Sequence, residues 1–262
     1  MKTIIITGAS SGIGYATAEA LCQNGYKVYN ISRGDCDIKG VINKRCDVTK
    51  TAKFVKVLED IIAKEGEIYA GIYSAGYSLA APIELTDDDK LRYLFDVNYF
   101  GAVTFCKALI PSMREARNGR FVLIGSMAGQ LPVPFLSAYC SSKSAVGSLA
   151  QGISQELDDY GIRCTCVMPG GTATEFTARR DKLNCHDTEY NEAYCKALAN
   201  IGVTEAKGMD AKKVADLIVR NLTKKAPPLF LPVGLSNTLT SAVAKFVPQE
   251  LVSMYMSSTF VN

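Results

Sequence analysis

The chain alternates short apolar runs with segments of helical periodicity, and this alternation constrains its fold more than any other feature. We interpret six apolar runs as strands, at residues 2–6, 27–32, 41–46, 68–74, 120–126 and 163–168. Residues 51–64, between the third and fourth runs, carry apolar side chains at helical spacing. Strands that alternate with helices predict a doubly wound, mostly parallel sheet with helices on both faces, the Rossmann fold.

The remaining segments complete a single α/β domain over residues 1–262. We expect a first helix that ends near Asn24, a long helical region over residues 88–117 that is interrupted near Pro111, and further helices at residues 138–160 and 211–222. Residues 229–233 form the last predicted strand. The polar residues 175–208 break the alternation, so we expect them to be a lid over the substrate. We expect residues 235–262 to form an amphipathic tail that packs on its own domain, covers a neighbouring subunit or touches a membrane surface.

Composition and charge exclude several classes of function. The formal net charge is only +3 and no long basic run occurs, so nothing indicates a nucleic-acid partner. No apolar stretch has the length of a signal-peptide core or a membrane span, and we expect a cytoplasmic protein. The nine cysteines include no C-x-x-C pair and the only histidine is His186, so we expect free thiols, no metal site and no Ser-His-Asp mechanism.

A glycine-rich turn, T-G-A-S-S-G-I-G, joins the first strand to the first helix at residues 7–14. Glycine allows a positive φ and a close approach of the backbone to a ligand. The helix N-terminus offers free N–H groups and the positive end of its dipole to a pyrophosphate. An ordinary glycine turn is the alternative, but the position between a strand and a helix favours dinucleotide binding. The expected contacts are Gly8, Ser10, Ser11, Gly12 and Ile13.

The end of the second strand bears on the choice of coenzyme. A site for NAD usually has an acidic residue there, which binds the ribose diol. This chain has Arg33 instead, and a guanidinium can donate to two oxygens of a 2′-phosphate at once. Arg33 is alternatively a solvated surface charge, and Asp35 or Asp37 can bind a diol if the loop turns back. We favour NADP(H) over NAD(H).

Four polar residues form a candidate acid–base constellation. Tyr139 and Lys143 are four positions apart in a predicted helix, so they share a face. An ammonium beside a phenol lowers the phenol pKa, and a shift of about three units takes about 4 kcal/mol, which Lys143 and the positively charged oxidised nicotinamide would supply together. Tyr139 would then exchange a proton with the substrate oxygen. Ser126 would hydrogen-bond the same oxygen, and the Asn98 amide would bind a water that links Lys143 to solvent.

Each of these residues taken alone has a simpler explanation. Y-x-x-x-K occurs by chance in a chain with 13 tyrosines. Asn98 alone is typical of a surface or capping residue, and Ser126 alone of a strand end. It is their order after a dinucleotide turn that indicates catalysis.

Together these residues resemble the short-chain dehydrogenase/reductase family, over residues 2–174 and more weakly through the last strand. The turn at residues 7–14 fits T-G-x-x-x-G-x-G, and Asn98, Ser126, Tyr139 and Lys143 fit the family's Asn-Ser-Tyr-Lys tetrad. One departure is Ser74, which stands where the family has asparagine in N-A-G. The resemblance implies that adenine is bound by Asp47 and Val48, that the nicotinamide carboxamide is held in P-G-x-x-x-T, and that the remaining cofactor contacts are Ala75, Gly76, Asn98, Tyr139, Lys143, Pro169, Thr172 and Thr174.

The resemblance implies an NADP(H)-dependent oxidoreductase that transfers a hydride between the nicotinamide and a ketone or secondary alcohol. Similarity around residues 125–129 and 139–143 to hydroxysteroid and retinol dehydrogenases favours a lipophilic substrate such as a hydroxysteroid. An apolar pocket would be lined by Met127, Leu131, Val133, Phe135, Met168 and Phe176. The family usually forms homodimers or homotetramers through the helices that carry Asn98 and Tyr139.

Two alternatives remain open. A 3-oxoacyl carrier-protein reductase would need basic residues at the pocket mouth, for which Arg114, Arg117 and Arg120 are the candidates. A non-catalytic NADP(H)-binding sensor would share the fold without the chemistry, although such a protein does not need the Tyr-Lys pair.

Overall fold

The computed structural model describes residues 1–261 and contains one seven-stranded parallel sheet in the order β11-β7-β6-β4-β1-β2-β3. The predicted α/β fold is thereby confirmed as a single domain, and each predicted strand is present with small shifts at its ends. The strands are β1 (Thr3–Thr7), β2 (Lys27–Ser32), β3 (Val41–Arg45), β4 (Ala70–Tyr73), β6 (Gly119–Ile124), β7 (Ile162–Met168) and β11 (Phe230–Pro232).

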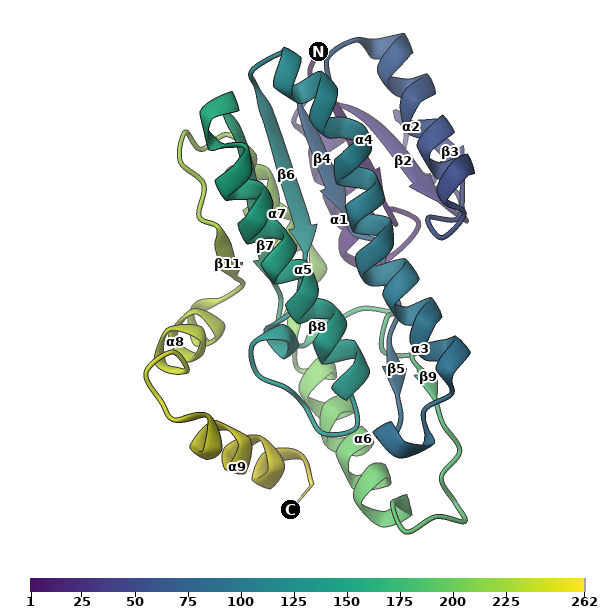
Figure 1. Ribbon diagram of the computed structural model, residues 1–262, viewed down its shortest axis with the longest axis vertical. Helices are drawn as coiled ribbons and strands as arrows, with labels where there is room; N and C mark the ends of the chain where they lie inside the picture. The colour runs from purple at the N-terminus through teal and green to yellow at the C-terminus, as the bar shows by residue number, and fades with distance from the viewer. Residues whose placement is uncertain (262) are drawn as a thin grey trace.

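Helices cover both faces of the sheet (Figure 1). The buried side chains of α2 (Thr51–Glu65), α4 (Gly101–Glu115) and α5 (Ser137–Glu156) share one hydrophobic cluster with one face. Those of α1 (Gly12–Gln23) and α7 (Ala211–Leu222) share a second cluster with the other face. Parallel strands connected by right-handed crossovers require this double cover.

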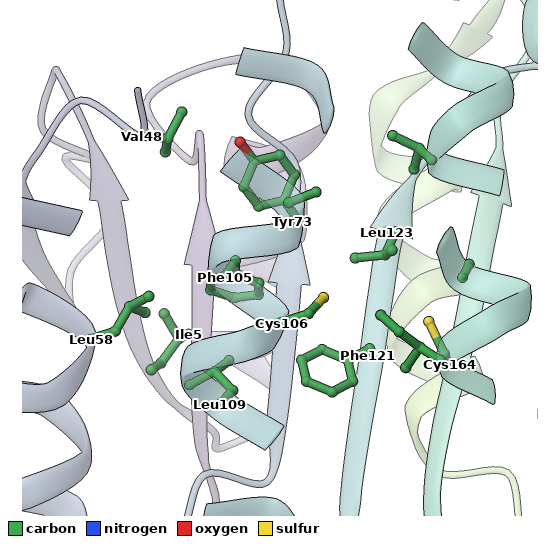
Figure 2. Packing of buried hydrophobic residues seen from close by; sticks show 14 of the residues in the cluster. Ile5, Val48, Leu58, Tyr73, Phe105, Cys106, Leu109, Phe121, Leu123 and Cys164 are labelled. Carbon is green, nitrogen blue, oxygen red and sulfur yellow. The ribbon is translucent and has the colours of Figure 1, made fainter. Parts of the chain in front are cut away.

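The core follows from the two-residue period of the central strand. Ile5 points into the cluster with α2 and α4, whereas Ile4 and Ile6 point into the cluster with α1 and α7. Figure 2 shows Ile5 beside Leu58 and Leu109, each of them fully buried. Because both faces of β1 are buried, the strand reads as a continuous apolar run rather than an alternating one.

The long helical region is interrupted, but not where we predicted. α3 (Asp88–Phe95) passes into a π-helical turn, Asp96–Phe100, before α4 begins. In that turn the N–H of Gly101 bonds to the carbonyl of Asp96, five residues back. Pro111 instead lies inside α4, which continues to Glu115. The prediction near Pro111 was wrong because proline is a common cause of a break but does not always make one.

The carboxyl ends of the strands meet at one edge of the sheet, and the irregular segments gather there (Figure 1). The order reverses around β1, which pairs with β2 on one side and β4 on the other. Such a switch point opens a crevice for ligands. Around it lie the two short pairs β5 (Leu79–Ala80) with β9 (Asp181–Lys182), and β8 (Thr172–Ala173) with β10 (Met209–Asp210).

Three further helices lie at the same end of the molecule. α6 (Asn191–Ala206) comes from the polar segment 175–208 and packs against α9 (Gln249–Phe260). α8 (Leu235–Val243) follows β11 and precedes α9 in the tail. Within residues 1–261, none of the helices combines the length and the apolar character needed to span a bilayer.

Candidate active site

The glycine-rich turn has the shape of a phosphate cradle. Gly8 and Gly12 have φ of +71° and +59°, which side chains rarely adopt. A Cβ at Gly8 would lie 2.9 Å from the Cα of Ala75, so the turn packs directly on the loop after β4. Ser11 caps α1 without a side-chain hydrogen bond, which leaves the first-turn amides of this helix facing the crevice.

Buried polar side chains hold the turn against its neighbours. Asn30 of β2 accepts the N–H of Ala9 at 3.1 Å. The Thr7 hydroxyl accepts the N–H groups of Ser74 and Ala75, both at 3.0 Å. Asn30 carried no motif signal in the sequence, and only the register of β2 beside β1 reveals its role.

A cavity of about 740 Å³ begins at this turn and follows the carboxyl edge of the sheet. Every residue that we predicted to contact a cofactor lines it, with the exception of Asn98. These residues are Gly8, Ser10, Ser11, Gly12, Ile13, Arg33, Asp47, Val48, Ala75, Gly76, Tyr139, Lys143, Pro169, Thr172 and Thr174. The residues therefore form one continuous surface of the size of a small-molecule site.

The end of the cavity beyond β2 has the charges expected to distinguish the two coenzymes. Arg33 is exposed, and its guanidinium donates to the Tyr93 hydroxyl at 3.3 Å. The carboxylate of Asp35 is held by Arg45 in a two-pronged ion pair at 2.5 and 2.8 Å. The pairing with Arg45 lowers the pKa of Asp35. Within residues 1–261 Arg33 therefore forms no ion pair, whereas Asp35 is paired with Arg45.

The predicted acid–base residues come together in another part of the cavity, between α5 and the end of β6. Ser126 lies near the Tyr139 phenol and lowers its pKa, while the Ser126 hydroxyl accepts the N–H of Ala128 at 3.1 Å. Lys143 Nζ lies 5.8 Å from the centre of the Tyr139 ring and donates to the carbonyl of Ile124 at 2.8 Å. All three side chains line the cavity. The helical spacing of Tyr139 and Lys143 in α5, one turn from its start, places both beside the end of β6.

Burial is the main cause of the pKa shifts of Tyr139 and Lys143 in the chain without a ligand. It raises the pKa of the Tyr139 phenol well above its ordinary value, against the hydrogen bond to Ser126, which lowers it. Burial also lowers the pKa of Lys143 to about 8. The predicted lowering of the phenol pKa requires the bound oxidised nicotinamide as well as Lys143. In the chain alone, desolvation opposes both charged forms.

Asn98 lies behind the cavity, in the π-helical turn. Its amide nitrogen donates to the carbonyl of Tyr77 and to the hydroxyl of Ser142, both at 2.9 Å. Its amide oxygen accepts the N–H of Tyr77 at 2.8 Å. Both amide hydrogens are therefore used within the protein, and the side chain fixes the loop after β4 to α5 instead of donating to a water.

The apolar part of the cavity agrees only partly with our prediction. Met127, Leu131, Val133 and Phe176 line it. Met168 lies in the core between the sheet and α5, and Phe135 packs edge-on against Tyr190 and Tyr194. The additional apolar walls come from Leu136, Ile201, Met256 and Phe260, on segments distant in the sequence.

Three charged residues of segment 175–208 line the cavity, although no pattern in the sequence predicted them. Arg180 is buried and donates to Glu205 at 2.5 Å and to Ser78 at 3.1 Å. Arg179 reaches back to the phosphate turn, where its guanidinium lies 3.4 Å from the Ser11 hydroxyl. No motif marks these positions, because their partners Ser11, Ser78 and Glu205 are distant in the sequence.

The basic residues that a carrier protein would meet are at the wrong end of the sheet. Arg120 lies at the start of β6, where it donates to the carbonyl of Gly161. Arg114 and Arg117 lie beside the Tyr160 ring at that same end. The cavity opens at the carboxyl ends of the strands, so these three residues do not form its mouth.

Comparison with known proteins identifies the class to which this fold and site belong. The family model for short chain dehydrogenases matches residues 2–184. The chain belongs to the short-chain dehydrogenase/reductase family, whose members are oxidoreductases of alcohol and keto groups with a nicotinamide cofactor.

Individual relatives cover nearly the whole chain. It is 30% identical over 255 residues to a 3-ketodihydrosphingosine reductase of Bacteroides thetaiotaomicron, covering 96% of this chain and 95% of the relative. An NADPH-dependent 1-acyldihydroxyacetone phosphate reductase of Saccharomyces cerevisiae is 29% identical and covers 99% and 91%. The crystal structure of a short-chain dehydrogenase from Streptomyces avermitilis superposes with a TM-score of 0.82 at 30% identity, covering 97% of both chains.

Proposed function

We propose that this protein is an NADP(H)-dependent oxidoreductase that interconverts a lipophilic ketone and its secondary alcohol. One observation carries the proposal. Tyr139, Ser126 and Lys143 lie together in the cavity that begins at the phosphate turn, with the Lys143 amine 5.8 Å from the centre of the Tyr139 ring. A proton donor and a cofactor cradle thus share one continuous site.

The residues present fit a dinucleotide. The uncapped amides of α1 and the Ser10 and Ser11 hydroxyls would hold the diphosphate. Asp47 and Val48 would contact the adenine, and Pro169, Thr172 and Thr174 the nicotinamide. Arg33 would bind the 2′-phosphate, since Asp35 is already paired with Arg45. When bound, the nicotinamide supplies or accepts the hydride.

The side chains divide the proton chemistry between them. Tyr139 gives a proton to the substrate oxygen during reduction and takes it back during oxidation. Ser126 holds that oxygen beside the phenol. Lys143, whose pKa of about 8 lies close to neutrality, returns a proton to Tyr139 and in its charged form favours the phenolate. Asn98 is a positioning residue, because it fixes the loop after β4 to α5.

The apolar walls favour a lipophilic substrate. Leu131, Val133, Phe176, Ile201 and Met256 present hydrocarbon to the part of the cavity near Tyr139. The Bacteroides and Saccharomyces relatives are named for lipid ketones, and a hydroxysteroid falls within the same chemical class. A 3-oxoacyl carrier-protein reductase is less well supported, because the three arginines lie at the opposite end of the sheet.

We also propose that the protein is a homodimer or homotetramer. The helices that carry Asn98 and Tyr139 form the usual subunit contact of the family, and Phe100, at the end of the π-helical turn, is exposed. Exposed aromatic side chains on a helix face favour association. Sedimentation analysis of the purified protein tests this proposal, and a monomer at micromolar concentration contradicts it.

Tyr139→Phe is the decisive test of the catalytic assignment. It removes one hydroxyl, and with it the proton donor, while the ring that packs on Phe176 remains. We expect turnover of a lipophilic ketone, followed by the absorbance of NADPH, to fall about 100- to 10,000-fold. Binding of NADPH, followed by its fluorescence, should change little.

Tyr160→Phe is the matched control, because Tyr160 lies at the far end of the sheet beside Arg117. This variant should retain full turnover. NADPH binding without turnover of any ketone or alcohol by the wild-type protein would identify a sensor instead of an enzyme.

A further inference from the structure

The two tail helices present an apolar surface to solvent. Seven of the twelve large hydrophobic side chains exposed within residues 1–261 lie between positions 235 and 255. We call them the tail surface: Leu235, Leu239, Val243, Phe246, Leu251, Met254 and Tyr255. So dense a group departs from the scattered apolar residues of an ordinary protein surface, and such patches mark interaction sites.

The spacing of these residues makes each helix two-sided. Leu235, Leu239 and Val243 recur every four positions along α8 and share one face. In α9, Met256 and Phe260 are buried, while Leu251, Met254 and Tyr255 are exposed. The outward apolar residues are therefore not a by-product of packing, because α9 already has a buried face of its own.

The inner side of the same helices is a wall of the proposed active site. Asn237 of α8 and Met256 and Phe260 of α9 line the cavity. The tail surface is thus separated from the substrate site by the thickness of one helix. Figure 1 shows α8 and α9 following one another outside the sheet layers, at the end where the strands finish.

The charge of the tail fits a neutral partner. Residues 235–262 contain only Lys245 and Glu250 as charged side chains, and their charges cancel. The polar positions of both helices are otherwise mostly serine, threonine, asparagine and glutamine. A partner recognised through ion pairs would require more charge than this surface offers.

We propose that the tail surface docks on a phospholipid bilayer, with α8 and α9 lying in the interface, and that the substrate enters the cavity from the lipid. The helices have 9 and 12 residues, which suits a position in the interface rather than across the membrane. The source of the substrate rests on the proposed function, whereas docking itself does not.

A bilayer explains the exposed side chains better than a second copy of the chain does. Leu235 and Phe246 are 92% and 88% exposed, so they stand clear of the surface. Fluid acyl chains surround protruding side chains without a matching shape, whereas a protein interface requires complementary hollows.

Vesicle flotation tests the proposal with the full-length protein. The probe is phosphatidylcholine vesicles, compared with vesicles that contain phosphatidylglycerol. The variant combines Leu235→Ser, Leu239→Ser, Phe246→Ser and Leu251→Ser, all at exposed positions. We expect the wild type to float with neutral vesicles and the variant to bind at least about tenfold more weakly. The matched control combines Ile83→Ser with Tyr160→Ser, exposed apolar residues elsewhere, and should bind like the wild type.

Turnover separates docking from catalysis. The tail variant should reduce a short water-soluble ketone as the wild type does, but lose at least about tenfold in the reduction of a ketone embedded in vesicles. If neither the wild type nor the variants reduce either ketone, the proposed function is refuted, while the flotation result remains valid.

Three results overturn the proposal: no flotation of the wild type, equal flotation of the tail variant, or binding to anionic vesicles alone. A smaller assembly of the tail variant in sedimentation, without vesicle binding by the wild type, would assign the surface to a subunit contact and overturn it too.

Discussion

At the scale of single residues, the protonation of Lys143 follows from where its amine lies. The amine donates to the carbonyl of Ile124 inside the protein, and burial lowers its pKa to about 8. The unfolded chain keeps this proton up to about pH 10.4. Between these two values the unfolded state binds more protons than the native state, so the free energy of unfolding rises with pH.

Lys143→Met should remove this rise. Between about pH 8 and pH 10 the Lys143 amine should raise the free energy of unfolding of the wild type by up to about 3 kcal/mol. The variant has no amine at this position and should lack this increase. Urea denaturation of both proteins across this range measures the difference between them. The raised pKa of Tyr139 acts in the opposite direction only above about pH 10, because the unfolded phenol ionises there. Parallel curves for the two proteins would contradict the buried, depressed amine.

Two arginines that line the cofactor cavity should have different effects on coenzyme binding. Arg33→Ala should weaken NADPH about 10- to 100-fold and leave NADH nearly unchanged, because only NADPH carries the 2′-phosphate. Arg179→Met should weaken both coenzymes alike, because Arg179 lies beside Ser11 at the diphosphate turn. Fluorescence titration with each coenzyme measures both effects.

Arg92→Ala, at an exposed site on α3 outside the cavity, is the control for loss of a positive charge. An equal loss of NADH and NADPH binding in Arg33→Ala would show that Arg33 does not select the 2′-phosphate.

The residues that the sequence could predict are those whose partners are local. Gly8 and Gly12 belong to one turn, and Tyr139 and Lys143 to one helix, so spacing alone was informative. Arg180 precedes Glu205 of α6 by 25 positions and follows Ser78 by 102 positions. No local period connects them, and only the folded chain reveals the pair.

At the scale of elements, the π-helical turn sets the position of Asn98. The Tyr73 hydroxyl, at the end of β4, donates to the carbonyl of Val97 at 2.6 Å. Gly101 packs against the same hydroxyl, where a Cβ would lie within van der Waals overlap. A π turn frequently marks a functional site, because it shifts one side chain relative to a regular helix. A sequence pattern with a period of 3.6 residues predicts the helix but not the extra residue within it.

Gly101→Ala should therefore destabilise the protein by about 1–3 kcal/mol, since the new methyl group meets the Tyr73 hydroxyl. Turnover should fall with it as Asn98 moves. Adding Tyr73→Phe removes the colliding oxygen and should restore part of the stability. Thermal and urea denaturation of the single and double variants measure both effects.

Gly202→Ala is the control within α6, because no atom lies within 4 Å of the added Cβ. It should leave stability unchanged or raise it by up to about 1 kcal/mol. A Gly101→Ala variant as stable as this control would contradict the packing of the turn on Tyr73.

At the scale of the whole molecule, segment 175–208 is tied to the rest of the domain by buried charge. The Arg180 guanidinium donates to Glu205 of α6 and to Ser78, which lies beside β5. The carboxylate of Asp181 accepts a hydrogen bond from Tyr77 and forms an ion pair with Lys90. The overall fold was predictable because alternating strands and helices permit few topologies. The walls of the cavity were not, because Ile201, Met256 and Phe260 reach it from segments whose order in the chain does not indicate their position.

Glu205→Gln should destabilise this connection by about 3 kcal/mol, because it leaves the Arg180 cation buried without its counter-charge. Limited proteolysis should then cleave segment 175–190 faster than in the wild type, and urea denaturation should show the loss. Asp60→Asn, in the exposed pair with Lys56, is the matched control and should cost less than about 1 kcal/mol. Equal effects of the two substitutions would show that the buried pair does not anchor the segment.

The threonine that ends β1 has a consequence for how binding competence is acquired. Its hydroxyl accepts two amides from a loop 67 and 68 positions further along the chain. The phosphate turn therefore depends on the loop after β4 for its shape, although its whole sequence motif lies in residues 7–14. A nascent chain or an excised βαβ fragment would contain the sequence motif but would not bind the coenzyme tightly. Affinity for the coenzyme should appear only after the central strands of the sheet have paired.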